Sequence, residues 1–152
     1  MFDERHLGVM STIELRQRLV DIALQWQSMY GVAPAITSAI SELDAASLVG
    51  MPATDYAAFM RNQTAVARGL DFVWQGVRYQ VKANRPSGKP GSRVTRVPKA
   101  KNYEWDRLIW ILYSTAYSIE EAWSWEREPY RVAFENLTRL SPSHYRAGRR
   151  LV

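Results

Sequence analysis

The chain contains the stretch Asp71-Phe72-Val73-Trp74-Gln75-Gly76-Val77-Arg78-Tyr79-Gln80-Val81-Lys82, and this stretch predicts the fold around it. Aromatic and β-branched residues, which favour strands, stand on both sides of Gln75-Gly76, which is a turn signal. A two-residue turn would pair Phe72 with Tyr79 and Trp74 with Val77, and side chains would alternate between the faces of each strand. The stretch is therefore predicted to form a β-hairpin.

One face of this hairpin would carry three polar side chains, those of Asp71, Gln80 and Lys82, while the other face would be apolar. Directly opposed residues have Cβ atoms about 4.5–5.5 Å apart. Hard cations such as Mg²⁺ take oxygen ligands, and a fixed ammonium group stabilises a reacting phosphate. The cluster indicates metal-dependent hydrolysis of a phosphodiester. An aspartate that only caps a turn and a solvated strand lysine are the alternative interpretation of the same residues.

The pattern resembles the PD-(D/E)xK nuclease superfamily, whose core is restriction-endonuclease-like. In that superfamily a helix acid precedes a hairpin that carries an aspartate and then a (Glu/Asp/Gln)-x-Lys triplet. Asp71 matches the aspartate, Gln80-Val81-Lys82 matches the triplet and Glu42 matches the helix acid. The resemblance extends from about Ala39 to Trp125, and Leu70 stands where the motif has a proline.

The resemblance implies a Mg²⁺- or Mn²⁺-dependent nuclease that hydrolyses phosphodiester bonds, with DNA as the expected substrate. Asp71 and Gln80 would bind the ion through side-chain oxygens, and Val81 through its backbone carbonyl. Lys82 would polarise the attacking water, and Glu42 would hold a water on the ion or assist a second ion. Because Gln80 is uncharged, a catalytically inactive nucleic-acid-binding module of the same fold is the alternative. A homodimer is a further expectation, since many members of the superfamily pair to cut both strands.

Positive charge is concentrated in two segments without acidic residues. The formal net charge is +5, and the range 83–103 contains only basic charged residues. These expected nucleic-acid-binding residues are Arg85, Lys89, Arg93, Arg96, Lys99 and Lys101. A second basic segment, the tail 139–152, lies beyond the last acidic residue, Glu135. Such acid-free segments indicate a polyanionic partner.

Composition bounds the class of protein. The 152 residues, 47% of them hydrophobic, suit one globular domain. There is no cysteine, which excludes a thiolate zinc site and a cysteine nucleophile, and the two histidines, His6 and His144, lie far apart in sequence. The charged first residues lack the apolar run of a signal peptide, and the run Leu108–Tyr113 is too short to cross a bilayer. A cytoplasmic protein without a membrane partner is expected.

The rest of the chain predicts an α/β fold: a small mixed β-sheet flanked by helices, in a single domain 1–152 with a nuclease-like core at about 37–126. Ser11 is the expected N-cap of an amphipathic helix 11–30, which Gly31 would end. Further helices are predicted over 37–49, 55–68 and 128–140, the hairpin strands over 70–74 and 77–83, and a proline- and glycine-rich loop over 84–101. Residues 105–113 should form a central strand, and 117–125 a partner strand, with a helix over 120–126 as the alternative.

Overall fold

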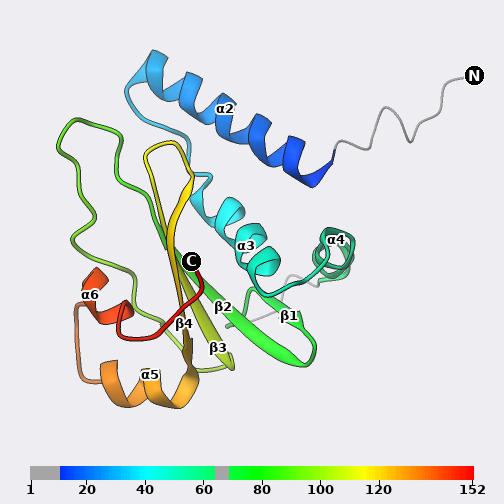
Figure 1. Cartoon of the computed structure of the whole chain (residues 1–152), viewed down its shortest axis with the longest axis vertical. Coiled ribbons are helices and arrows are strands. Elements are labelled where there is room, and N and C mark those ends of the chain that lie inside the picture. Colours follow the sequence, from blue (N-terminus) through cyan, green and yellow to red (C-terminus); the bar gives the residue numbers. More distant parts are fainter. Residues whose placement is uncertain (1–10, 64–68) are drawn as a thin grey trace, which may run out of the picture. The chain divides into compact units, whose positions relative to one another are not determined.

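The computed structural model describes residues 11–63 and 69–152. Its contacts divide the chain into two compact units, residues 1–36 and 37–152, and each unit has its own architecture. The described part of the first unit is built on one long helix, while the second unit contains a β-sheet with helices (Figure 1). Within the described ranges no helix is long and apolar enough to cross a membrane.

The long helix of the first unit is α2, Thr12–Tyr30. Its N-cap is Ser11, whose Oγ accepts a hydrogen bond of 3.2 Å from the backbone N–H of Glu14. Gly31, with φ of 85°, ends the helix in the left-handed conformation. Both ends lie where the sequence predicts them. The predicted apolar stripe is not buried, because four of its side chains are exposed: Leu15, Leu19, Ile22 and Trp26.

The second unit is built on a five-stranded mixed sheet with strand order β1-β2-β3-β4-β5. The strands are β1 (Phe72–Trp74), β2 (Val77–Asn84), β3 (Arg107–Tyr113), β4 (Ile119–Glu126) and β5 (Arg149–Arg150). Strands β2 and β3 run parallel, and the other neighbouring pairs run antiparallel. Together with the flanking helices, this sheet confirms the expected small α/β fold.

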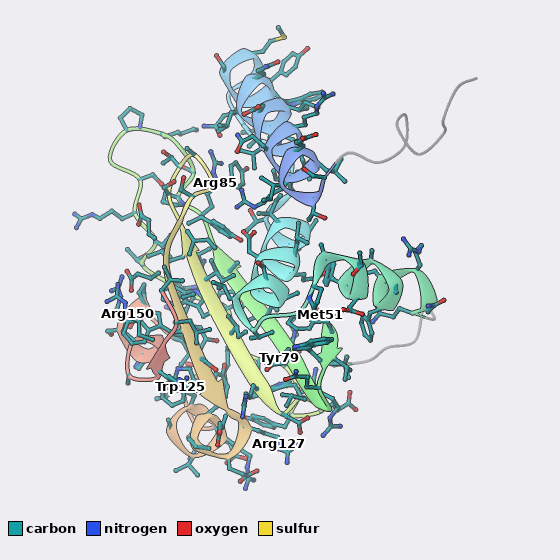
Figure 2. The ribbon with its side chains drawn as sticks, turned by 45° about the vertical axis from the view of Figure 1, so that its right-hand side comes forward. Met51, Tyr79, Arg85, Trp125, Arg127 and Arg150 are labelled. Carbon is teal, nitrogen blue, oxygen red and sulfur yellow. The ribbon has the colours of Figure 1, made fainter. Side chains whose placement is uncertain are left out.

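Helix α3, Thr37–Leu48, packs on one face of the sheet against β2 and β3. Ile40 of α3 and Ile109 of β3 are buried, and the Tyr113 hydroxyl donates a hydrogen bond to the carboxylate of Asp44. Helix α4, Ala53–Asn62, follows and contacts β1. Figure 2 shows Tyr79, which is buried, on β2. This face of the sheet therefore carries α3 along its middle.

The opposite face is covered by α5, Arg127–Phe134, and α6, Pro142–Tyr145. Trp110 of β3 packs in one buried cluster with Tyr130, Phe134 and Tyr145 of these helices. The indole N–H of Trp125, labelled in Figure 2, donates to the Tyr145 backbone carbonyl at 3.0 Å. Burial on both faces explains why the β3 sequence is an unbroken apolar run.

Several element boundaries differ from the sequence predictions. Helix α4 ends at Asn62, and Gln63 is already extended, so the predicted helix 55–68 is too long; residues 64–68 lie outside the described part. Residues 119–126 form the strand, so the alternative helix is wrong. Helix α5 ends near Glu135 rather than at residue 140, because Leu140 is buried and pairs with Val97 in an isolated bridge. The short strand β5 was not predicted.

The loop between β2 and β3 is only partly free of the core. Its proline- and glycine-rich first half is largely exposed, as expected, but Val97 and Ala100 are buried. The backbone N–H of Ala100 donates to the Tyr130 hydroxyl at 2.9 Å, and that hydroxyl lies 2.9 Å from the hydroxyl of Tyr145. The second half of the loop is thus anchored to the face that α5 and α6 cover.

Candidate active site

The hairpin that carries the site has the predicted register. Phe72 pairs with Tyr79 and Trp74 with Val77. Gln75 and Gly76 both have positive φ, 50° and 76°, as a two-residue turn of type I′ requires. The rings of Phe72 and Tyr79 stack with centroids 4.8 Å apart. The local sequence therefore fixes the position of Asp71 relative to the strand that contains Gln80 and Lys82.

Asp71 continues the hairpin ladder just before β1 begins. Its backbone N–H donates to the carbonyl of Tyr79 at 2.7 Å. Its Oδ2 accepts hydrogen bonds from the backbone N–H of Val81 at 2.7 Å and from Nε2 of Gln80 at 3.0 Å. Since the N–H and C=O of one strand residue point to the same edge, the Val81 carbonyl faces the same edge as Asp71. Three of the expected groups thus meet at one point of the sheet edge.

Glu42 reaches this point from α3. Its pKa is raised from 4.5 to about 7, because the side chain is partly buried, because the charge of Asp71 is close and because it hydrogen-bonds to Asp71. The two carboxyl groups therefore share a proton near neutral pH. Asp44, the other acid of the helix, is buried and bonded to Tyr113 instead. Residues two apart on a helix face different directions, and the structure turns Glu42 to the site.

Lys82 follows on β2 with its side chain half-buried. Burial lowers the pKa of its ammonium group, the charge of Asp71 opposes that change, and the nearby positive charge of Lys101 adds to it. The structure thus places a partly desolvated lysine within electrostatic reach of Asp71. A lysine with a lowered pKa exchanges its proton more readily near neutral pH than a solvated one.

Lys101 is held beside Lys82 by the anchored half of the loop. Just before it, Ala100 bonds to Tyr130; just after it, the Asn102 carbonyl accepts a 2.7 Å hydrogen bond from the Trp105 indole. A Cβ added to Gly69 would collide with the side chains of Asn102 and Glu104, so this segment lies directly against the chain that leads into Asp71. Lys101 therefore belongs to the site rather than only to a flexible basic loop.

Tyr56 of α4 is a site residue that the sequence did not indicate. Its pKa is raised to about 12, first by burial and then by the charges of Glu42 and Asp71. Its ring meets that of Phe72 edge-on, with centroids 6.3 Å apart. The helical pattern assigned Tyr56 to the apolar side of its helix, and no local signal showed that two carboxyl groups would lie near its hydroxyl.

The oxygen atoms at this edge match the donor set that Mg²⁺ prefers. Glu42 and Asp71 contribute carboxyl groups, Val81 a carbonyl and Gln80 an amide. Gln80 presents its amide nitrogen to Asp71, so its oxygen can face the same point only after the amide plane turns over. The described residues contain no group of three or more His, Cys, Asp and Glu side chains. The charge available for a cation therefore comes from two carboxyl groups.

The six basic residues of the loop fall into two groups. Arg85 donates from Nε to the Thr115 carbonyl at 2.8 Å, and its guanidinium lies 4.2 Å from the centre of the Tyr117 ring (Figure 2 labels Arg85). Lys99 donates from Nζ to two carbonyls just after α5, at 2.7 and 3.0 Å. Both side chains serve intramolecular contacts. Exposed charges remain at Lys89, Arg93, Arg96 and Lys101.

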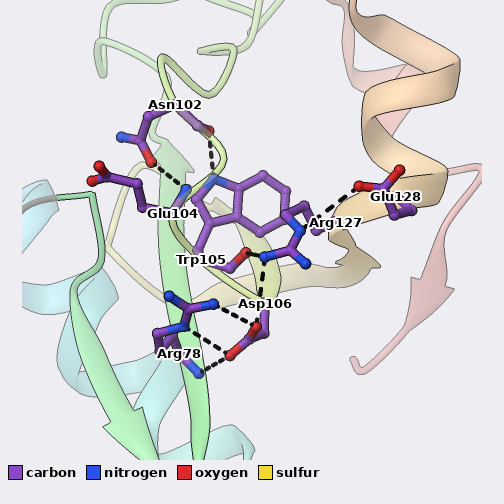
Figure 3. Close-up of polar contacts among 7 residues, drawn as sticks. All are labelled: Arg78, Asn102, Glu104, Trp105, Asp106, Arg127 and Glu128. Atoms are coloured by element: carbon purple, nitrogen blue, oxygen red, sulfur yellow. Dashed lines mark hydrogen bonds and ion pairs between the residues drawn. The ribbon is translucent and has the colours of Figure 1, made fainter.

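A network around Asp106 fixes the base of the site (Figure 3). Its carboxylate accepts from the backbone N–H of Arg78 at 2.9 Å and from two guanidinium nitrogens of Arg78 at 3.0 and 3.1 Å. Arg127 approaches the same carboxylate at 3.8 Å. Hydrogen bonds from the Arg78 side chain and backbone lower the pKa of Asp106 to about 2. The start of β2 is thus tied to the end of the loop and to the start of α5.

No protein-family model matches this chain, and no curated protein matches it significantly. The resemblance to the PD-(D/E)xK superfamily therefore rests on Glu42, Asp71, Gln80 and Lys82 and on their arrangement.

Proposed function

We propose that this protein is a metal-dependent nuclease of the PD-(D/E)xK type that hydrolyses phosphodiester bonds. The observation that carries the proposal is the meeting of Glu42 with Asp71. The motif assigns the two acids to different elements, and their carboxyl groups share a proton beside Gln80 and Lys82. A pair of carboxyl groups that raises one pKa to about 7 is poorly stable without a cation, which is typical of functional sites.

The chemistry assigned to this arrangement is attack of a water oxygen on phosphorus. One P–O ester bond breaks, and the departing sugar oxygen takes up a proton. A Mg²⁺ or Mn²⁺ ion, when bound, supplies positive charge beside the phosphate and acidifies water. Asp71 and Glu42 bind the cation, and Val81 and Gln80 complete the set of protein oxygens. Lys82 orients the attacking water and stabilises the developing negative charge.

The substrate proposed is nucleic acid, with DNA as the first choice. Four exposed basic residues lie in the loop that follows Lys82: Lys89, Arg93, Arg96 and Lys101. Contacts from such residues to phosphates position a nucleic acid without reading its sequence. Lys101 differs from the other three because it is close enough to Lys82 to lower the pKa of that lysine. We assign it to the phosphate that is being cleaved.

The second candidate function is nucleic-acid binding without cleavage. The observation that favours it is Gln80, which adds no negative charge and donates its amide hydrogen to Asp71. A cation at this site has one carboxylate fewer than in the commonest form of the motif. Weak metal binding would then leave a module that holds nucleic acid through its basic loop.

Cleavage of plasmid DNA with Mg²⁺ and with chelator tests the proposal. Lys82→Ala should lower the cleavage rate by roughly 10²–10³, because one fixed charge at a transition state contributes that much. Binding to a labelled duplex in chelator should change little. The matched control is Arg131→Ala, which removes one exposed positive charge on α5, where it pairs with Glu128. Equal cleavage by Lys82→Ala and the unaltered protein would refute the nuclease assignment. Binding without any metal-dependent cleavage would favour the second candidate.

A further inference from the structure

Helix α2 carries an apolar pattern that the fold does not use. Counting along the helix, the side chains of Leu15, Leu19, Ile22, Trp26 and Met29 recur at alternating intervals of four and three residues. We call these five side chains the α2 seam. Their exposed fractions lie between 36% and 73%. A globular protein gains nothing from such a row in water, since each of these side chains is stabilised by burial.

The interval identifies the kind of partner. An alternation of four and three residues has a mean period of 3.5, the heptad repeat that keeps one narrow stripe facing a second helix over several turns. A helix that packs on a broad globular surface instead has a wider stripe with a period of 3.6. The α2 seam extends over two heptads and thus over most of α2. The pattern is therefore that of a helix paired with another helix.

We infer that the α2 seam joins two copies of this chain as an antiparallel helix pair. In that arrangement Leu19 packs against Ile22 of the second copy, Leu15 against Trp26, and Thr12 against Met29, because an antiparallel seam sets each position of one heptad class against the other. The bulky Trp26 meets the smaller Leu15 rather than a second tryptophan. All positions of the seam are used, and the two-fold axis passes near the middle of α2.

Charge favours the antiparallel direction. Arg16 and Arg18 flank the seam on its two sides, and Glu14 and Asp21 lie on the far side of the helix from it. A parallel pair would bring four guanidinium groups to one level. The antiparallel pair separates the two arginine pairs by about 10 Å along the axis, at 1.5 Å per residue. The seam would bury on the order of 500 Å² on each copy, about 1,000 Å² in total, which is the lower limit of specific interfaces.

Sedimentation velocity of the full chain at about 50 μM tests the pairing. The expected species has twice the 17.5 kDa mass of the chain. Ile22→Glu should raise the dissociation constant at least 100-fold, because it places two carboxylates near the centre of the seam. The matched control is Ile13→Glu, which puts the same charge on an exposed apolar position of α2 outside the seam. A monomer for the unaltered chain, or an Ile22→Glu dimer, would overturn the inference.

Cross-linking gives a second measurement that does not depend on a disruptive variant. The chain has no cysteine, so single-cysteine variants carry one thiol each. A mixture of Thr12→Cys and Met29→Cys should form a disulfide-linked dimer under mild oxidation. Each variant alone should not, because its two thiols would lie about 25 Å apart in the antiparallel pair. Cross-linking of Thr12→Cys with itself, or no cross-link in the mixture, would refute the arrangement.

Discussion

Replacement of Gln80 by glutamate probes the candidate site most directly, because hydrogen bonding and metal binding respond with opposite signs. Nε2 of Gln80 donates to Oδ2 of Asp71 at 3.0 Å. In Gln80→Glu this donor becomes a third carboxylate beside Asp71 and Glu42. The metal-free protein should lose stability, while affinity for a divalent cation should rise.

The magnitude follows from the geometry. A hydrogen bond to a charged acceptor contributes about 1.5–3 kcal/mol. Repulsion between the new carboxylate and Asp71 adds to that loss, although the half-exposed site and proton uptake reduce it. A total of roughly 2–3 kcal/mol corresponds to a fall in Tm of about 5–10 °C for a chain of this size. A full charge next to the cation should tighten binding at least tenfold, or about 1.4 kcal/mol.

The assay combines melting curves with calorimetric titration of Mn²⁺ or Mg²⁺. Melting in chelator is measured at pH 8, where Glu42, with its pKa of about 7, is ionised. Gln80→Met serves as the control, since it removes the hydrogen bond without adding a charge and should lose stability without gaining metal affinity. An unchanged metal affinity in Gln80→Glu would remove Gln80 from the ligand set. The nuclease proposal would then rest on Asp71, Glu42 and Lys82.

The remaining predictions concern pH, the base of the site and the loop. In chelator, stability should fall as pH rises from about 4.5 to 7, because the folded protein keeps the Glu42 proton that the unfolded chain loses; Glu42→Gln should flatten this slope, worth roughly 1–2 kcal/mol after allowance for its partial exposure, in melting curves at several pH values. The Asp106 carboxylate, with its pKa lowered to about 2, should stabilise the fold above pH 4 and lose that contribution as the pH falls to about 2, so Asp106→Asn should lower Tm at pH 7 and have little effect at pH 2. Neutralising Lys89, Arg93 and Arg96 together should reduce the salt dependence of duplex binding by a slope of about 0.9 for each phosphate that the protein no longer neutralises, and an unchanged slope would place the binding face elsewhere.

The sequence by itself determined the local parts of this protein. The hairpin register, the Gln75-Gly76 turn and the two caps of α2 depend on neighbouring residues, and all were predicted correctly. The unbroken apolar run of β3 likewise indicated a central strand. The boundaries of α4 and α5 were predicted poorly, because helix periodicity does not show where a later segment will compete. Leu140 leaves the helical pattern to pair with Val97, which lies far away in sequence.

The tertiary structure alone decided which groups share the site. Helix spacing showed that Glu42 and Asp44 face apart but not which of them meets Asp71, and the packing of α3 on β2 answers that question. Tyr56 and Lys101 reach the site from α4 and from a loop anchored to Tyr130, and contacts between segments so distant in the chain leave no periodic signal. The strand β5 likewise forms from a basic tail because the edge of β4 offers unpaired backbone groups. Local patterns specify elements, whereas a site made from several elements exists only after they pack.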